Sequence, residues 1–326
     1  MISNKVTWLM PVKNGMPYLR ECLQSIYNQS YTNQEIIVWD NGSVDGSIEE
    51  LHNWIPKLIP GEVIDSNPIK NLGECRAALV KKANSELIAI MDCDDINHKD
   101  RLSIQVPLIL EKEKNVAVGS YINRVDKNNN FIRIEKLPKT NADILKWQLL
   151  FRCSLYQPTM LLKKSFVLKA GNYNYLSTAQ DYDLWLRLIQ LGKINIIERP
   201  LVNYRISNNS VSDNNRHKWD NVNKNLYIKY AHDFFNNLDE IDLLELWNKL
   251  SIHSKEFKKS KLETDFFIKC LNNFSDKNKI DINTLLSDKL ILKQYFRTKK
   301  SKSIKNILYF IYFKIIKNKT VLDSIK

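Results

Sequence analysis

Residues 6–40 read VTWLMPVKNGMPYLRECLQSIYNQSYTNQEIIVWD, two short apolar runs on either side of a stretch with helical spacing. The runs at 6–11 and 35–40 are apolar at consecutive positions, as strands covered on both faces must be. Between them, apolar side chains recur every three or four residues over 18–29, which predicts an amphipathic helix. This order of strand, helix and strand is typical of parallel strands joined by a crossover helix.

The same alternation continues to about residue 95 and then loosens. Before that point we expect strands at 61–65 and 86–92, a helix at 76–83, and a helix at 47–54 that opens on a capping box of Ser47 and Glu50. Beyond it, the pattern predicts helices at 101–113, 141–151, 165–170 and 181–192, and strands at 116–122, 158–163, 194–197 and 201–206. From residue 214 onward the spacing is helical only. The fold class is therefore expected to be α/β, with a mostly parallel Rossmann-like sheet, flanking helices and an α-helical C-terminal region beyond a boundary near residue 213.

The composition is that of an ordinary folded protein. The 326 residues are 44% hydrophobic and 26% charged, which excludes intrinsic disorder for most of the chain. Five scattered Cys with no CxxC spacing indicate neither a disulfide framework nor a zinc site, and they fit a reducing cytoplasm. No apolar run reaches the roughly 18 residues of a membrane span. The apolar stretch near the N-terminus is too short for the core of a signal peptide.

The net charge of +13 is concentrated at one end of the chain. Residues 289–326 contain eleven Lys or Arg and one Asp, a net charge of +10. Within this basic tail, lysines flank an apolar stretch at 307–316, and on a helix they would gather near both of its ends. Such a helix is too short to span a bilayer, so we expect it to lie in the interface of an anionic membrane. The open alternative is a last helix that packs its apolar stripe on the helical region.

Acidic residues gather where the predicted strands end. Asp40 and Asp65 close the second and third strands, and Asp92, Asp94 and Asp95 follow the fourth. In an open parallel sheet, ligands bind outside the carboxyl ends of the strands. Two carboxylates in the sequence Asp-Cys-Asp repel each other, which favours a hard divalent cation that bridges protein to substrate phosphates. On spacing alone, the alternative is that Asp94 and Asp95 cap the next helix.

Four blocks of sequence resemble one known family. Neither GxGxxG nor GxxxxGK[ST] occurs, so dinucleotide and P-loop sites lose their usual support. The blocks at 6–47, 71–95 (ending in DCDD), 155–188 and 200–212 resemble, in order, family-2 glycosyltransferases of the GT-A fold and their DxD motif. The resemblance covers residues 5–212. It implies a GT-A glycosyltransferase domain at 1–213, with a nucleotide-sugar half at about 1–95 and an acceptor half at about 96–213, ahead of the helical region 214–326.

The resemblance also assigns donor contacts by position. It implies that Pro11 and Asp40 contact the donor, Asp40 as the acid that meets the nucleotide base, usually uracil. Asp45 corresponds to the second acid of that loop, whereas Asn41 stands where the family usually has an acid. Arg76 corresponds to an arginine near the donor diphosphate. Without the resemblance, Arg76 would be taken for a helix-surface arginine.

Metal and catalytic roles follow in the same way. Asp92, near the donor ribose or sugar, and Asp94 are the implied ligands of Mn²⁺ or Mg²⁺, and Arg205 is a further donor contact. Asp181, in AQDYDLW, corresponds to the catalytic base. The alternative for Asp181 is a helix-terminal acid stabilised by the macrodipole. Ser207 stands where many relatives have a His that touches the metal or the diphosphate, so the third metal contact is unassigned.

The implied activity is inverting, metal-dependent transfer of a sugar from a nucleotide-sugar donor, a UDP-sugar, to a hydroxyl of a growing surface glycan or lipid-linked saccharide. The expected location is cytoplasmic, at the inner face of the cell membrane. Two other classes stay open. The substitutions at Asn41 and Ser207 suit a nucleotide-sugar-binding or scaffold protein without turnover, and the basic tail suits nucleic acid. Because that tail carries an apolar run rather than scattered stacking aromatics, no nucleic-acid partner is expected.

Overall fold

The computed structural model describes residues 4–65, 69, 71–137, 142–176, 178–206, 216–236, 238–251, 264–288 and 291. Within them, a nine-stranded sheet has the order β3-β2-β1-β4-β8-β6-β9-β5, with β7 paired to β6. The strands are β1 (Val6–Val12), β2 (Gln34–Asp40), β3 (Gly61–Asp65), β4 (Leu87–Ile90), β5 (Ile96–Asn97), β6 (Asn115–Val125), β7 (Phe131–Glu135), β8 (Leu161–Lys163) and β9 (Lys193–Arg205). The helices are α1 (Leu19–Tyr27), α2 (Ser47–Trp54), α3 (Leu72–Lys82), α4 (Arg101–Leu110), α5 (Ala142–Phe151), the 3-10 helix η1 (Gln157–Thr159), α6 (Lys164–Lys169), α7 (Gln180–Leu191), α8 (Arg216–Phe234), α9 (Glu240–Leu250), α10 (Thr264–Asn278) and α11 (Ile282–Leu286).

The first half of the sheet is parallel, as the alternating sequence pattern predicts. Strands β3, β2, β1 and β4 pair side by side in one direction. Successive side chains of β1 enter two different cores, because Trp8 and Met10 belong to one buried cluster and Leu9 to the other. A strand buried on both faces must be apolar at every position, which is why VTWLMP carries no alternation. The α/β fold class is confirmed.

Beyond β4 the sheet becomes mixed. Strand β8 lies antiparallel to both β4 and β6, whereas β6 and β9 run parallel. The sequence predicted two strands at 194–197 and 201–206, but β9 is continuous from Lys193 to Arg205. Pro200 lies inside it, where the register with β6 shifts on both sides of Tyr121. A proline cannot donate to the ladder, and an irregularity there lets the strand continue past it.

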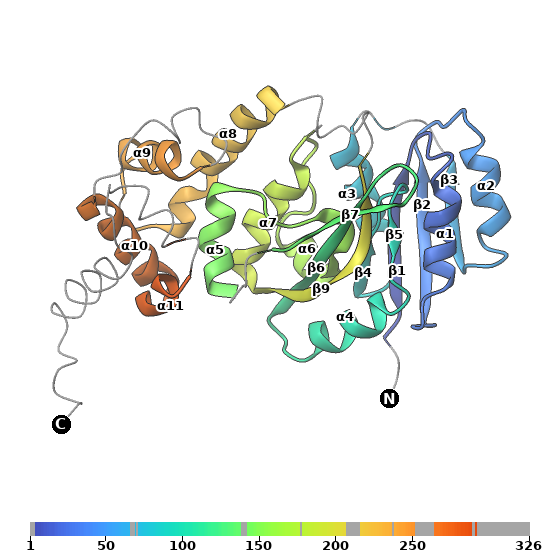
Figure 1. The fold of residues 1–326 in the computed structure, drawn as a ribbon, viewed down its shortest axis with the longest axis horizontal. Coiled ribbons are helices and arrows are strands. Elements are labelled where there is room, and N and C mark those ends of the chain that lie inside the picture. Colours follow the sequence, from blue (N-terminus) through green and yellow to red (C-terminus); the bar gives the residue numbers. More distant parts are fainter. Residues whose placement is uncertain are drawn as a thin grey trace.

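The C-terminal helices pack on α5, at the end of the molecule opposite α1 and α2 (Figure 1). Trp147 of α5 joins them, because its ring meets those of Phe235, Phe267 and Phe274 at centroid distances of 5.1–6.2 Å. The predicted boundary near residue 213 and the apolar stretch at 307–316 lie outside the described residues. In the part of the chain that the structure describes, no helix has the length and apolarity needed to cross a membrane.

Candidate functional site

The polar residues named from the sequence meet at the carboxyl edge of the parallel strands. Asp40 ends β2 beside Val12, the last residue of β1 and the neighbour of Pro11. The acidic segment that contains Asp92 and Asp94 follows the end of β4, the other neighbour of β1. Strand ends separated by about fifty residues of sequence therefore supply one rim, as the rule for open parallel sheets predicts.

Asp40 has one carboxylate oxygen in use and one without a partner. Its Oδ2 accepts hydrogen bonds from the backbone N–H groups of Gly42 and Ser43 at 3.1 and 3.0 Å, which fixes the turn after β2. Its Oδ1 is buried and has no hydrogen-bond partner among the described residues. A buried oxygen left without a donor costs about 1–3 kcal/mol, so this atom suits a ligand that brings an N–H group.

The hydrogen bonds of Asn41 explain why an amide stands where the family usually has an acid. Its amide nitrogen donates to the carbonyl of Ile69 at 3.1 Å, and its amide oxygen accepts from the N–H of the same residue at 2.6 Å. An ionised acid accepts but cannot donate, so only an amide makes both bonds. The asparagine therefore ties the loop after β2 to the chain between β3 and α3.

Asp45 organises the loops that border the rim. Its carboxylate accepts from the N–H of Met16 at 2.9 Å and from the hydroxyl of Ser47 at 2.6 Å. Desolvation raises the carboxyl pKa of the exposed Asp45, but these hydrogen bonds outweigh it and the net pKa is lowered. The capping box expected at Ser47 is wrong, because the N-cap of α2 is Gly46 and Ser47 already lies inside the helix. The Ser47 hydroxyl instead accepts from the N–H of Gly15 at 2.9 Å.

Arg76 is a buried partner of Asp92 and not a helix-surface residue. An Nη of Arg76 lies 2.7 Å from Oδ1 of Asp92, and the arginine side chain is 7% exposed. Burial alone would lower the guanidinium pKa, but the charges of Asp92 and Asp181 help to raise it. Helix α3 places Arg76 there by close approach, because a Cβ on Gly73 would lie only 2.2 Å from the carbonyl oxygen of Asn174.

Asp181 lies in the first turn of α7, facing the same charges. The helix follows Ala179, whose φ of 55° is unusual for a residue with a Cβ. Burial raises the carboxyl pKa of Asp181, the Arg76 guanidinium opposes that shift, and the Asp92 carboxylate adds to it. Arg76, Asp92 and Asp181 therefore form one electrostatic cluster drawn from α3, the segment after β4 and α7.

The structure separates the two acids of α7. Asp183 is completely buried, and its carboxylate accepts from Asn174 and from the hydroxyl of Tyr230, both at 2.7 Å, and pairs with Arg187. Asp181 is partly exposed, and its carboxylate accepts a hydrogen bond from the neighbouring N–H of Tyr182 at 2.8 Å. The interior holds Asp183, whereas Asp181 remains accessible from the rim.

Asp94 and Asp95 do not cap the next helix. Strand β5 follows them directly, and the N-cap of α4 is Asp100. Burial and the nearby Asp92 carboxylate raise the pKa of Asp94 to about 6, and the same causes, with Asp94 itself, raise the pKa of Asp95 well above its ordinary value. Such a charged, crowded rim is stabilised by a cation. Among the described residues, however, no group of three His, Cys, Asp or Glu is arranged to hold a metal, so substrate oxygens would have to complete any coordination.

Arg205 holds the acidic segment in place. Its Nε donates to the carbonyl of Asp94 at 2.9 Å, one Nη to the carbonyl of Lys127 at 2.8 Å, and the other to Glu21 at 2.6 Å. The guanidinium also lies over the ring of Tyr18 at 4.3 Å. Contact of Arg205 with the donor stays a prediction, since in this structure all three of its nitrogens bind protein groups.

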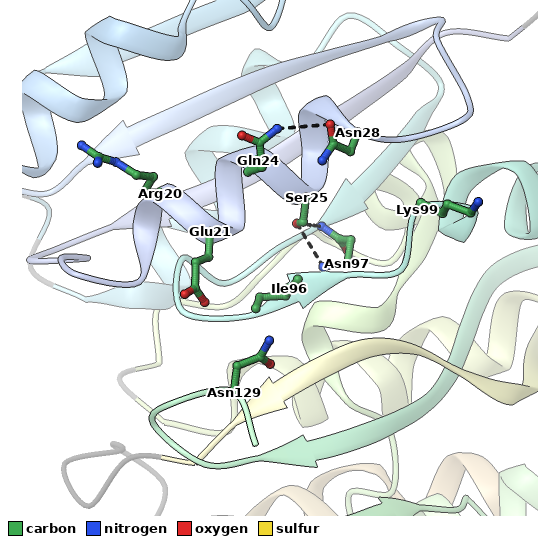
Figure 2. A pocket seen from close by; sticks show the side chains of 9 residues that line it. All are labelled: Arg20, Glu21, Gln24, Ser25, Asn28, Ile96, Asn97, Lys99 and Asn129. Carbon is green, nitrogen blue, oxygen red and sulfur yellow. Dashed lines mark hydrogen bonds between the residues drawn. The ribbon is translucent and has the colours of Figure 1, made fainter. Parts of the chain in front are cut away.

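A hollow of about 420 Å³ lies beside the rim, between α1, β5 and the turn that holds Asn129 (Figure 2). Its lining includes none of the residues predicted for the donor or the metal. Two charged residues on its wall are already paired, Arg20 with Glu50 and Glu21 with Arg205. We therefore place the candidate site at the acidic rim and not in this hollow.

Sequence reasoning missed two members of the site. Tyr173 is buried and lies within reach of the charges of Arg76, Asp181 and Asp92, and burial raises its pKa to about 12. Gln157 donates to the Tyr173 hydroxyl at 2.6 Å. Neither position has a motif of its own, and only the fold brings the segment around η1 beside the rim.

The comparisons agree on the class of protein. The sequence profile of Glycosyl transferase family 2 matches residues 7–167. An uncharacterized glycosyltransferase of Methanocaldococcus jannaschii is 30% identical over 59% of this chain and 67% of its own length. The O-antigen biosynthesis glycosyltransferase WbnJ of Escherichia coli is 29% identical over 64% of this chain and 82% of its own. The E. coli UDP-Glc:alpha-D-GlcNAc-diphosphoundecaprenol beta-1,3-glucosyltransferase WfgD is 24% identical over 66% and 84%.

Two solved structures share the fold. Residues 1–349 of S. aureus TarS in complex with UDP-GlcNAc match with a TM-score of 0.60 and 18% identity, over 90% of this chain and 87% of that one. The mannosyltransferase PcManGT from Pyrobaculum calidifontis, in complex with GDP-Man and Mn²⁺, matches with a TM-score of 0.54 and 13% identity, over 98% and 82%. The chain belongs to glycosyltransferase family 2 and has the GT-A fold. It is a glycosyltransferase.

Proposed function

We propose that the protein is an inverting, metal-dependent transferase that moves a sugar from a UDP-sugar to a hydroxyl of a growing surface glycan or lipid-linked saccharide. The observation that carries the proposal is the cluster of Arg76, Asp92 and Asp181 on one rim. In this cluster the Arg76 guanidinium, which suits the leaving diphosphate, lies near the Asp181 carboxylate, which suits the attacking hydroxyl. The names of WbnJ and WfgD support the glycan and lipid-linked acceptors.

The donor end of the site begins at Asp40. Its unpartnered Oδ1 is an acceptor for a base N–H such as that of uracil. Pro11 precedes Val12, the residue that pairs with Asp40, which supports a donor contact for Pro11 as well. Asp45 fixes the loops on either side, and TarS, a structural neighbour, was solved with UDP-GlcNAc.

A divalent cation, Mn²⁺ or Mg²⁺, would be held by Asp94 and Asp92 together with oxygens of the donor diphosphate. Bound there, it would neutralise charge that develops on the leaving diphosphate. The residues fit such an ion, because the carboxyl pKa of Asp94 is raised by burial and by Asp92, a strain that a cation relieves. PcManGT was solved with Mn²⁺, which supports the same proposal. Arg205 holds the backbone carbonyl of Asp94 and so positions this ligand.

Asp181 is the proposed base. An acceptor hydroxyl loses its proton to the Asp181 carboxylate while its oxygen forms a bond to the anomeric carbon, and the bond from that carbon to the nucleotide diphosphate breaks. Attack from the side opposite the leaving group inverts the stereocentre in a single displacement. A positioned carboxylate base is worth about 10²- to 10⁴-fold in rate. The Arg76 guanidinium opposes the rise that burial causes in the carboxyl pKa of Asp181, and so favours the ionised form.

The decisive experiment measures nucleotide diphosphate release from a panel of UDP- and GDP-sugars, with Mn²⁺, with Mg²⁺ and with chelator. We expect one UDP-sugar to be hydrolysed, and only when metal is present. If donors bind but no nucleotide diphosphate is released, even after acceptor extracts are added, the scaffold alternative is favoured. With transfer in hand, the proton NMR coupling of the new anomeric centre tells inversion from retention.

Membrane attachment is a separate proposal, and its basis is the sequence of the basic tail. The apolar stretch at 307–316 with its flanking lysines suits the interface of an anionic bilayer at the inner face of the cell membrane. Deleting residues 301–326 is expected to release the protein from anionic liposomes while donor hydrolysis persists. Equal sedimentation of the truncated and full-length chains would refute the attachment.

A further inference from the structure

A second polar cluster lies next to the part of the rim that holds Asp181. The segment from residue 152 to Gln157, the first residue of η1, passes the rim, because Gln157 donates to the Tyr173 hydroxyl at 2.6 Å. Desolvation and the charge of Asp181 both raise the pKa of the Cys153 thiol, which lies in this segment. An acceptor hydroxyl at Asp181 would therefore have this segment as its neighbour.

The segment carries buried polar atoms that the protein leaves unmatched. Ser154 is 4% exposed and Gln157 is 5% exposed, yet the Ser154 hydroxyl and the Gln157 Oε1 have no hydrogen-bond partner among the described residues. The Nε of Arg152 is buried and likewise without a partner in the described chain. Buried polar groups in native proteins are almost always satisfied, so three such atoms within six residues point to a bound polar group.

Arginine and tyrosine side chains continue the cluster on the sheet. Arg124 of β6 and Tyr204 of β9 are direct neighbours in the parallel register, and the ring of Tyr204 lies 5.8 Å from that of Tyr156. The Arg124 guanidinium hydrogen-bonds the hydroxyl of Tyr156. Its Nε is 3.0 Å from the Glu135 carboxylate, an ion pair without the alignment of a hydrogen bond.

The charge of this cluster is positive. Arg124 and Arg133 share one carboxylate, that of Glu135. A third guanidinium, that of Arg152, lies close enough to the Tyr156 hydroxyl for its charge to lower the pKa of that group. Guanidinium groups with free N–H donors are the groups that proteins use for phosphate. Two tyrosine rings beside them offer flat faces for the C–H side of a sugar ring.

We propose that Arg124 and Arg152, with Tyr156 and Tyr204, form an acceptor subsite that recognises a phosphate group attached to the acceptor sugar. This proposal rests on the proposed function and names the chemistry of its acceptor. The sugar lies on the tyrosine rings with one hydroxyl toward Asp181, and its phosphate meets the two guanidinium groups. A diphosphate that links a sugar to a lipid and a phosphodiester within a glycan share this chemistry.

The test is a binding measurement that needs no turnover. Isothermal titration with UDP present, so that the donor position is filled, compares a short-alkyl diphosphate of N-acetylglucosamine, a methyl phosphodiester of the same sugar and the uncharged alkyl glycoside. We expect at least about tenfold tighter binding of one phosphate-bearing probe than of the glycoside, which is about 1.4 kcal/mol. The probe that binds more tightly identifies the source of the phosphate.

Substitutions locate the preference. Arg152→Gln and Arg124→Gln should each remove most of it, Arg152→Lys should restore part of it, and Arg199→Gln, an exposed arginine elsewhere on β9, should leave it unchanged. Thermal melting of each variant shows that it is folded. Equal binding of all three probes, or a preference that survives both glutamine variants, overturns the proposal. A failure of the proposed function would look different, as absence of any nucleotide-sugar hydrolysis or UDP binding.

Discussion

Helices α3 and α4 pack on opposite faces of the sheet, and each buries an arginine with a different fate. Arg101 of α4 is fully buried among neutral oxygens, those of Gln105, Asn97 and two backbone carbonyls. Burial lowers the pKa of its guanidinium to about 9. Arg76 of α3 is nearly as buried, but it faces carboxylates, its pKa is raised, and its Nε has no partner in the described chain.

The difference teaches which buried charges belong to a site. Arg101 and Asp183 have their hydrogen-bonding capacity met by the protein, so they hold the core together. Arg76 and Asp181 face the rim, and each has hydrogen-bonding capacity that the described part of the protein does not use. Completeness of partners, rather than depth of burial, separates scaffold from site here. The predictions below test that separation.

The largest effect is expected for Asp94→Asn. The change removes one of two carboxylates proposed to hold the cation, so metal-dependent donor hydrolysis should fall by about 10³-fold or more, because charge on the leaving group is no longer offset. The melting temperature should stay the same or rise, since a carboxyl whose pKa is raised by burial destabilises the folded protein at neutral pH. Turnover equal to that of the parent, with and without chelator, would remove Asp94 from the metal site.

Asp181→Asn should reduce transfer by about 10²-fold while donor affinity stays near that of the parent. The amide keeps the shape of the carboxylate but cannot take a proton. Steady-state transfer rates and donor titrations measure the two quantities separately. Asp233→Asn, an exposed acid on α8, is the matched control and should change neither.

The pH profile sharpens the same test. A base must be ionised, so transfer falls as the pH drops through its pKa, and burial of Asp181 moves that fall above the ordinary Asp range. The acidic fall assigned to Asp181 should vanish from the residual activity of Asp181→Asn. Its persistence there would assign the proton transfer to another group.

Asp183→Asn should reverse the pattern. The amide leaves the largely buried guanidinium of Arg187 facing a neutral group, so the free energy of unfolding should fall by about 3 kcal/mol. Urea unfolding measures it, and activity per folded molecule should be largely retained. Asp233→Asn again serves for comparison, with a change of under about 0.5 kcal/mol. A stable but inactive Asp183→Asn would break the distinction between the two acids of α7.

The smallest effect is expected for Asn41→Asp, which restores the acid usual in the family. The carbonyl of Ile69 would lose its donor, at a cost of about 1 kcal/mol. Because that bond ties the loop after Asp40, the donor KM should rise about fivefold with kcat little changed. Tighter donor binding by the variant would show that the amide serves another purpose.

Sequence periodicity predicted most of the scaffold. Continuous apolar runs predict parallel strands such as β1 and β2, and apolar residues spaced three or four apart predict the helices between them. The sequence predicts two strands where β9 is continuous, because a proline normally ends a strand. Only the register shifts between β6 and β9 show that β9 continues past Pro200. The predicted capping box at Ser47 was wrong because the Ser47 hydroxyl donates to Asp45 and accepts from the N–H of Gly15 instead of capping α2. The spacing of Ser47 and Glu50 alone does not reveal these contacts.

The site could be predicted only where a motif marks it. Asp40, Asp92 and Asp94 stand at strand ends, where the topology alone implies a rim. The ion pair from Arg76 to Asp92 depends on how tightly α3 approaches the loop before α7, which no local pattern records. Arg124 and Arg152 lie outside the four blocks that resemble the family, and no local pattern predicts that residues of three distant segments meet around Tyr156.

The hydrogen bond from Tyr230 to Asp183 joins two parts of the chain 47 residues apart. A ribosome makes the acid first, and N-terminal segments fold as they emerge. Until residue 230 has left the exit tunnel, the nascent transferase lacks one of the groups that its buried carboxylate needs. The start of α7, which carries Asp181, is therefore completed late in synthesis, and a prematurely terminated chain would carry a weakened helix at the position of the proposed base.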